Sequence, residues 1–349
     1  MTAAAPHERG RRFQELDAFR GIAALWVVLF HYLYRYGEMM QGAGAAVPVL
    51  PPLSNGNLPV YWFFIISGFV ITWTVERGPG LEAFAVSRFS RLYPTYWAAL
   101  LLTFALGITA PLPTQHYTVP QLLWNATMLQ EYAGIADIDG AYWSLAVELL
   151  FYAYMAAFLW LGWIEHLAWI ALAWAIASVA THLAADLGHE LWWRVQVLTL
   201  LRFAHFFVAG IAFFQIWRGR AMAVSACTLA LSLLSVFLTY GIADALACAV
   251  FFALFVAAIS GRIGWIVNPA TLWLGAISYA LYVSHELLGY RIIALLDGNG
   301  LPRPASVALA MLFALAVATL LTRAVERPAM RFIRRRAVPL ATVQTALPR

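Results

Sequence analysis

The chain has 349 residues, of which 63% are hydrophobic and only 11% are charged. This composition excludes an ordinary soluble domain and predicts an all-α, polytopic membrane protein. The net charge of +5 would suit a nucleic-acid partner, but the arginines lie between apolar runs, so membrane topology explains them better and we expect no nucleic acid to bind.

Apolar runs long enough to cross a lipid bilayer recur along the whole chain. We predict about ten membrane-spanning helices joined by short connections. Their approximate ranges are 18–36, 58–76, 92–110, 142–162, 166–184, 196–217, 222–240, 243–260, 271–294 and 305–325. Residues 1–336 are expected to form one transmembrane domain, followed by a short tail without regular structure at 337–349.

The arginines are concentrated in alternate connections between these runs. Ten spans place on one side of the membrane Arg9, Arg11, Arg12, Arg77, Arg88, Arg91, Arg218, Arg220, Arg262, Arg327, Arg331, Arg334, Arg335 and Arg336. The opposite connections, at 37–57, 111–141 and 185–195, are poor in arginine. Because arginine-rich connections stay in the cytoplasm, we predict that both termini are cytoplasmic.

The first predicted span carries an unusual set of polar residues. Arg20 and His31 are eleven positions apart, which is three helical turns plus roughly 20°, so both project from one face. The rise per residue places His31 roughly 16 Å from Arg20, near the middle of the bilayer. Asp17 and Arg35 lie close to the same face. His31 is either a packing residue or, as we favour at this depth, a general base or proton relay.

Two short motifs follow on the second span and just before the third. The sequence Ser67-Gly68-Phe69 either allows close helix packing or lets a ligand approach the backbone. Arg88 and Arg91 lie three positions apart in a predicted loop before the third span. They either anchor the chain to lipid headgroups or hold phosphate groups, for which guanidinium donors are well suited.

Further polar residues lie inside later spans. Ser144 and Glu148 are four positions apart and share a face of the fourth span. A buried Glu148 carboxylate needs a partner, and we expect an arginine or a histidine. His285 lies within the ninth span, and Arg202 and His205 lie within the sixth. Together these residues predict a helix bundle with a polar interior.

The order and spacing of these motifs resemble the acyltransferase-3 family of integral-membrane acyltransferases over nearly the whole chain. The matching elements are Arg20 and His31 (arginine, ten residues, histidine), Ser67-Gly68-Phe69, Arg88 and Arg91, Trp143 to Glu148 (WSLAVE), Ser278 to His285 (SYALYVSH) and Glu326-Arg327-Pro328. The resemblance implies transfer of an acyl group, commonly acetyl, from acyl-CoA to a hydroxyl of a sugar in a cell-surface glycan or lipid-linked precursor. It also implies a multi-pass protein of the bacterial cytoplasmic (inner) membrane.

The resemblance also implies roles for individual residues. We expect acyl-CoA to approach from the cytoplasm and to meet a catalytic histidine near the middle of the membrane. The expected catalytic residues are His31, Arg20 and Glu148; the expected donor-binding residues are Arg88, Arg91, Ser67 and Tyr93; the expected substrate-binding residues are Trp143, Ser144 and His285. We expect no metal, because the two cysteines, Cys227 and Cys248, lie singly in apolar runs.

Other functions fit some of these residues. Polar groups at the bilayer midplane also occur in proton-coupled secondary transporters, although the chain lacks an evident internal repeat. His31 with His205 or His285 would suit a haem-binding electron carrier. A purely structural membrane protein does not explain the buried polar face. An acyltransferase acting on a small natural product is a further alternative.

Overall fold

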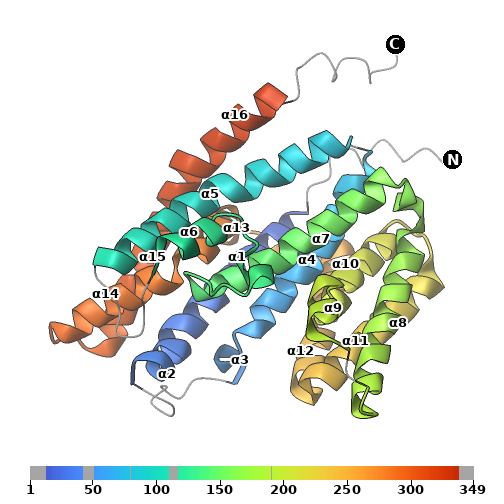
Figure 1. The fold of residues 1–349 in the computed structure, drawn as a ribbon, viewed down its shortest axis with the longest axis horizontal. Helices are drawn as coiled ribbons and strands as arrows, with labels where there is room; N and C mark the ends of the chain where they lie inside the picture. Colours follow the sequence, from blue (N-terminus) through green and yellow to red (C-terminus); the bar gives the residue numbers. More distant parts are fainter. Residues whose placement is uncertain (1–12, 42–50, 79, 110–116, 190, 338–349) are drawn as a thin grey trace.

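A computed structural model describes residues 13–41, 51–78, 80–109, 117–189 and 191–337 of the chain. Figure 1 shows these residues as a bundle of long helices, and the described ranges contain no strand. The helices are α1 (Gln14–Leu29), α2 (Tyr36–Gln41), α3 (Pro51–Ser54), α4 (Asn57–Glu76), α5 (Leu81–Thr109), α6 (Val119–Asn125), α7 (Trp143–Trp160), α8 (Leu167–Asp186), α9 (Trp193–Leu198), α10 (Ala204–Trp217), α11 (Met222–Tyr240), α12 (Ile242–Ile259), α13 (Pro269–Ser284), α14 (Glu286–Gly298), α15 (Arg303–Leu321) and α16 (Arg327–Ala337). Two π-helical segments, Phe30–Arg35 and Thr322–Glu326, join α1 to α2 and α15 to α16.

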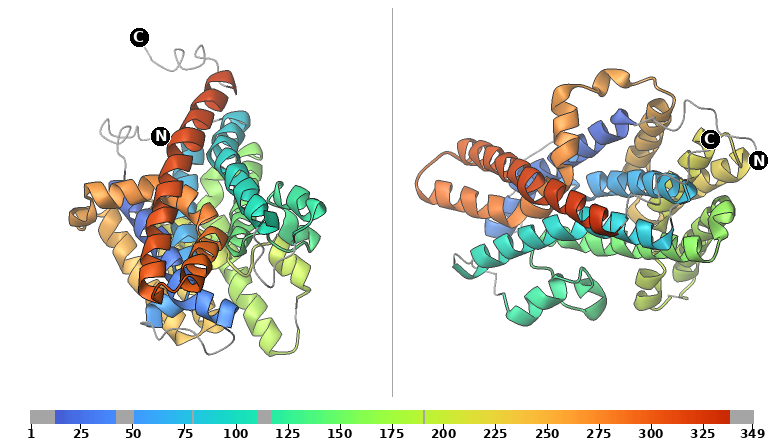
Figure 2. Two further views of the ribbon diagram at one scale, coloured as in Figure 1. Left: turned by 90° about the vertical axis from the view of Figure 1, so that its left-hand side faces the viewer. Right: turned by 90° about the horizontal axis from the view of Figure 1, so that it is seen from above.

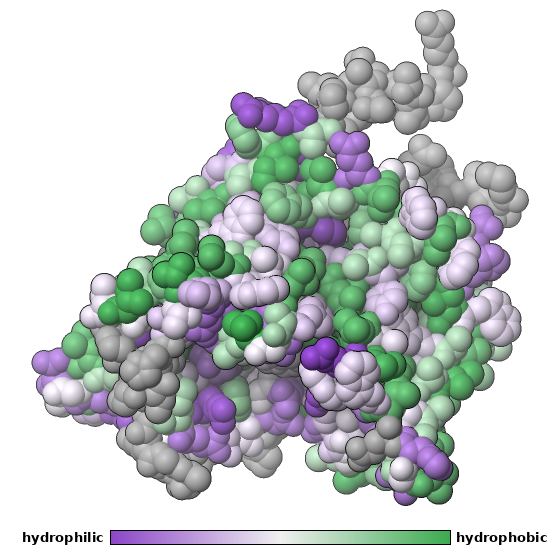
Figure 3. All heavy atoms as spheres, in the orientation of Figure 1, coloured by the Kyte–Doolittle hydropathy of each residue, from purple (hydrophilic) through white to green (hydrophobic). Residues whose placement is uncertain are grey.

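Eight helical stretches of the described chain are long and apolar enough to cross a membrane. They are Gln14–Met39, Asn57–Glu76, Leu81–Thr109, Gly140–Trp160, Trp163–Asp186, Met222–Tyr240, Ile242–Ile259 and Arg303–Ala337. Large apolar side chains are exposed over much of the outer surface, as expected where lipid replaces water. Figure 3 shows them beside a hydrophilic group at the C-terminal end of α16. The prediction of an all-α polytopic membrane protein is confirmed.

Two of the predicted spans are not continuous helices. The sixth is divided into α9 and α10, and the 14 residues of α10 reach only about 21 Å, less than the hydrocarbon core. The ninth is divided at His285 into α13 and α14. At that break the backbone N–H of Leu287 donates to Asp139 Oδ2 over 3.2 Å. A side chain therefore satisfies a backbone group that the break would leave unpaired.

The third predicted span begins earlier than expected. Helix α5 starts at Leu81 and contains Arg88 and Arg91, which the sequence placed in a loop. The polar spacing of this segment is typical of an amphipathic helical turn, and that turn continues without interruption into the apolar part of α5. The two arginines are therefore held on a rigid helix rather than on a connection.

Helices α1 and α13 pack closely at a pair of glycines. A Cβ added at Gly21 would lie 2.6 Å from the Gly275 nitrogen, and one added at Gly275 would lie 2.2 Å from the Asp17 carbonyl oxygen. From this crossing, His31 is ten positions further along α1, and His285 is ten positions further along α13. The two helices run in the same direction, so the equal spacing brings the two histidines together.

Helices α4 and α10 pack at a second pair of glycines. A Cβ at Gly68 would lie 2.2 Å from the Phe207 carbonyl oxygen, and one at Gly210 would lie 2.8 Å from Gly68 Cα. Of the two interpretations of Ser67-Gly68-Phe69, close helix packing is therefore correct for Gly68. The neighbouring Ser67 faces a cavity instead.

Several arginine-rich helix ends lie at one end of the bundle. Glu76, at the end of α4, forms an ion pair with Arg220 and lies 4.0 Å from Arg218, both of which follow α10. Figures 1 and 2 show α16 running alongside the first part of α5 at this same end. This arrangement is the one that the positive-inside rule requires.

Candidate active site

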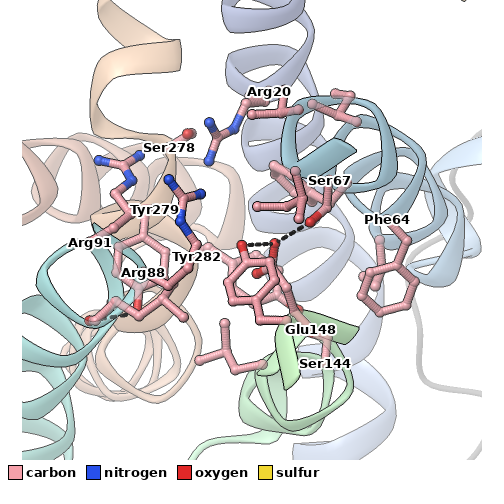
Figure 4. A pocket seen from close by; sticks show the side chains of 18 of the residues that line it. Arg20, Phe64, Ser67, Arg88, Arg91, Ser144, Glu148, Ser278, Tyr279 and Tyr282 are labelled. Atoms are coloured by element: carbon pink, nitrogen blue, oxygen red, sulfur yellow. Dashed lines mark hydrogen bonds between the residues drawn. The ribbon is translucent and has the colours of Figure 1, made fainter. Parts of the chain in front are cut away.

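The predicted donor-binding arginines surround one cavity of about 220 Å³, here called the arginine cavity. Arg20 enters it from α1, Arg88 and Arg91 from α5, and Arg334 from α16. Figure 4 shows the guanidinium groups of Arg20, Arg88 and Arg91 pointing towards one another. The other lining residues are Val60, Phe63, Phe64, Ile66, Ser67, Val70, Ile71, Leu92, Ser144, Leu145, Glu148, Tyr152, Ser278, Tyr279 and Tyr282.

Glu148 is the acidic residue that lines this cavity. Its Oε1 accepts hydrogen bonds from Ser67 Oγ over 2.8 Å and from the Tyr152 hydroxyl over 2.6 Å (Figure 4). The expected hydrogen bond from an arginine or a histidine is therefore replaced by two hydroxyl groups. Arg20 acts on Glu148 through its charge. The two hydroxyl groups thus hold the Glu148 carboxylate in one orientation.

The arginines are unequally paired within the described residues. Arg91 forms an ion pair with the buried Glu326. Arg88 instead donates a hydrogen bond to Ser87 Oγ over 2.9 Å and lies 5.8 Å from the Tyr152 ring. The cavity therefore has more positive than negative side chains, which suits an anionic ligand.

His31 lines a different cavity, of about 270 Å³, here called the histidine cavity. It is bounded by Val27, Phe30, His31, Tyr34, Glu38, Ser54, Asn55, Gly56, Asn57, Val60, Gly140, Ala141, Trp143 and Tyr282. Arg20 does not line it. Residues of one helix face thus serve two cavities, which follow each other along α1.

The two histidines form a hydrogen-bonded pair whose tautomers follow from their partners. His285 Nδ1 lies 2.9 Å from the Tyr282 carbonyl oxygen, which only accepts, so Nδ1 carries the proton. His285 Nε2 then accepts from His31 Nδ1–H over 3.0 Å. The same His31 N–H lies 2.9 Å from the Val27 carbonyl oxygen. Neutral His31 therefore presents the lone pair of Nε2, which is what a general base requires.

Two carboxyl groups adjoin this pair. Glu286 Oε2 lies 3.4 Å from His31 Nε2, and a hydrogen bond joins Glu286 to Asp139. Asp139 lies in the connection before α7, where burial, and then the charge of Glu286, raises its pKa well above the usual range. The hydrogen bond between the two carboxyl groups requires that one of them carries a proton. The Glu286 carboxylate can stabilise a positive charge on His31.

Val60 and Tyr282 separate the two cavities, since each lines both. The Tyr282 hydroxyl lies 2.6 Å from Ser144 Oγ, and either oxygen can donate. Ser144, from α7, thereby holds a side chain of α13 between the two spaces. A ligand that reaches from the arginine cavity to His31 therefore has to pass Val60 and Tyr282.

The remaining predicted site residues lie apart from one another. Trp143 lines the histidine cavity and also a cavity of about 350 Å³ that includes Arg202. Tyr93 lies outside both main cavities, where its hydroxyl donates to the Thr127 carbonyl oxygen over 3.0 Å. His205 is buried next to Ser235, 3.1 Å away. It does not pair with His31.

Several residues in or beside the two cavities were not among the predicted site residues. Tyr152, Tyr282 and Arg334 line a cavity, whereas Asp139, Glu286 and Glu326 pair with residues that do or with one another. Glu286 and Glu326 are carboxylates at the border of apolar runs, and this position in the sequence could have marked them as candidate site residues. Arg334 belongs to an arginine-rich segment that topology alone explains. The described chain contains no group of three or more His, Cys, Asp or Glu residues suited to a metal ion.

Comparisons with known proteins identify the family of the chain. A family model described as "Acyltransferase domain" matches residues 13–323. The chain is 27% identical to "Acyltransferase MdmB" of Streptomyces mycarofaciens over 380 aligned positions, which cover 95% of each chain. It is 31% identical to "Nodulation protein 10" of Rhizobium leguminosarum bv. viciae, over 26% of this chain and 29% of that protein. No solved structure matches significantly. The chain therefore belongs to the acyltransferase-3 family of integral-membrane acyltransferases.

Proposed function

We propose that this acyltransferase moves an acyl group, acetyl in the first instance, from acyl-CoA to a hydroxyl of a sugar in a cell-surface glycan or its lipid-linked precursor. We place it in the bacterial cytoplasmic membrane. The observation that carries the proposal is the pair of adjoining cavities, one rich in arginine and one containing His31. They suit a polyanionic donor and a neutral acceptor, respectively.

The donor side of the proposal depends on charge. Acyl-CoA carries a pyrophosphate and a phosphomonoester, and forked guanidinium donors bind such groups with charge-assisted hydrogen bonds. Arg88 and Arg91 lie on one rigid helix and line the same cavity. With the phosphates there, the pantetheine arm extends between Val60 and Tyr282 and delivers the thioester to His31.

The reaction is an ordinary acyl transfer. His31 Nε2 takes the proton of the acceptor hydroxyl while the oxygen attacks the thioester carbonyl carbon. The C–S bond then breaks, and the CoA thiolate takes the proton back from the imidazolium. Glu286, 3.4 Å from Nε2, stabilises the charged imidazolium. His285 fixes the His31 tautomer.

The test measures transfer from radiolabelled acetyl-CoA into glycan and lipid-linked sugar fractions of membranes that contain the protein. We expect His31→Ala to lower kcat by about 10²- to 10⁴-fold, the usual range for a general base. We expect Arg88→Ala to raise KM for acetyl-CoA by about ten- to one-hundredfold, the loss of a charge-assisted hydrogen bond. Matched controls are His166→Ala and Arg262→Ala, which replace exposed residues outside both cavities.

Two outcomes contradict the proposal. The first is full transfer activity in a folded His31→Ala protein. The second is proton-coupled solute uptake into proteoliposomes without any acyl donor, which indicates a transporter. Label in a small soluble product instead of a glycan fraction would retain the acyl transfer and replace the acceptor.

A further inference from the structure

Helix α16 brings a fourth arginine to the arginine cavity. The helix continues α15 through the π-helical segment Thr322–Glu326 and packs against α5 (Figure 2). Arg334 Nε donates to Ser90 Oγ over 3.1 Å. Ser90 is fully buried and lies between Arg88 and Arg91 in the sequence. Its hydroxyl therefore fixes Arg334 beside both arginines of α5.

The cluster of Arg88, Arg91 and Arg334 carries more positive charge than the carboxylates beside it neutralise. Arg88 and Arg334 each donate to a serine hydroxyl, and neither has a carboxylate partner in the described part of the chain. Glu326 is engaged by Arg91. Like charges held close together destabilise the folded state unless a ligand neutralises them. A polyanion with more than one phosphate group would neutralise such a cluster.

The order of the arginines indicates which phosphate each one meets. Arg20 lies on the helix that also carries His31, whereas Arg334 is exposed in the last turn of α16. In acyl-CoA the thioester is at one end, the pyrophosphate lies in between, and the 3′-phosphate of the ribose is at the far end. A donor whose thioester points to His31 thus places its 3′-phosphate furthest from that histidine.

We infer that α16 completes the donor site and that Arg334 selects donors carrying a ribose 3′-phosphate. This inference depends on the proposed use of acyl-CoA. It assigns a specificity role to a segment outside residues 13–323, the part that matches the family. Arg88 and Arg91 then serve the pyrophosphate, which CoA and dephospho-CoA share.

The experiment compares acetyl-CoA with acetyl-3′-dephospho-CoA as donors for the full-length protein. We expect the wild type to prefer acetyl-CoA by about ten- to one-hundredfold in kcat/KM, and Arg334→Ala to reduce this ratio to about one. Arg334→Lys keeps the charge but loses the forked donors, so we expect an intermediate ratio. The matched control is Arg335→Ala on the same helix, outside the arginine cavity, which should keep the wild-type ratio.

The alternative phosphate is that of a lipid headgroup, and the same assay in nanodiscs distinguishes it. An Arg334→Ala effect that appears only with anionic lipids, and equally for both donors, would assign Arg334 to the lipid and overturn the inference. An unchanged donor ratio would also overturn it, as would equal losses for both donors, because these indicate a general structural role. A wild type that uses neither donor would instead contradict the proposed function.

Discussion

His31 is the proposed catalytic base, and the residues around it determine which of its ring nitrogens can accept a proton. It lies in a π-helical segment, Phe30–Arg35, a distortion that occurs often at functional sites. His285 holds one ring nitrogen, and Glu286 faces the other. Since a single hydrogen bond sets which nitrogen is free, the pair makes His31 Nε2 the basic atom. Depth in the membrane alone would not have given this result.

Replacing Glu286 with glutamine tests the role of its charge. Glutamine keeps the shape but cannot stabilise an imidazolium, so we expect kcat to fall by about ten- to one-hundredfold. KM for acetyl-CoA should stay unchanged, because Glu286 does not line the arginine cavity. Steady-state kinetics checks this, with the exposed Glu165→Gln as control. A rise in KM with kcat unchanged would show that Glu286 acts on the donor instead.

Helical periodicity was enough to predict which residues of the first span share a face, but not what lies opposite them. Arg20 and His31 share a face because helical periodicity alone determines it. That each lines a different cavity depends on Val60 and Tyr282, which arrive from other helices. Likewise, Glu148 was expected to need a partner, but the hydroxyls of Ser67 and Tyr152 fill that role. Pairwise contacts between distant segments leave no local periodic signal.

At the scale of helices, close crossings place the site residues. The Gly21–Gly275 crossing sets the register between α1 and α13, and the Gly68–Gly210 crossing joins α4 to α10. Small residues allow such approach in membranes, where packing rather than water exclusion holds helices together. Hydropathy predicted most spans but not the break at His285. That break depends on Asp139, a residue far away in sequence.

A methyl group at Gly68 should therefore destabilise the protein. The new Cβ would meet the backbone carbonyl of Phe207, which cannot move without shifting α10, and overpacking of this kind costs about 1–3 kcal/mol. We expect the Tm of Gly68→Ala in detergent to fall by several degrees. The matched control, Gly264→Ala, has no atom within 4 Å of the added Cβ and should melt like the wild type. Equal Tm values for both variants would show that the α4–α10 crossing tolerates a wider spacing.

The positions of the two cavities in the whole bundle predict from which side of the membrane the donor enters. The arginine cavity borders α16 and the first part of α5, at the arginine-rich end of the bundle. Positive charge of this kind marks the cytoplasmic side. His31 lies further along α1, roughly 16 Å from Arg20. The donor and an acceptor in the histidine cavity would thus approach from different sides and meet at Val60 and Tyr282.

Proteoliposomes test this sidedness, because acyl-CoA is too polar to cross a bilayer. Protease sensitivity of a tag on the C-terminus reports which molecules expose their predicted cytoplasmic end. We expect labelled acetyl-CoA added outside to support transfer in proportion to that exposed fraction. Acetyl-CoA trapped inside should serve the remaining molecules, and detergent should abolish the difference. Transfer in proportion to the protease-protected fraction would mean that the donor enters from the opposite side, and transfer independent of the tag orientation would mean that it enters from both sides. Either result would contradict cytoplasmic entry.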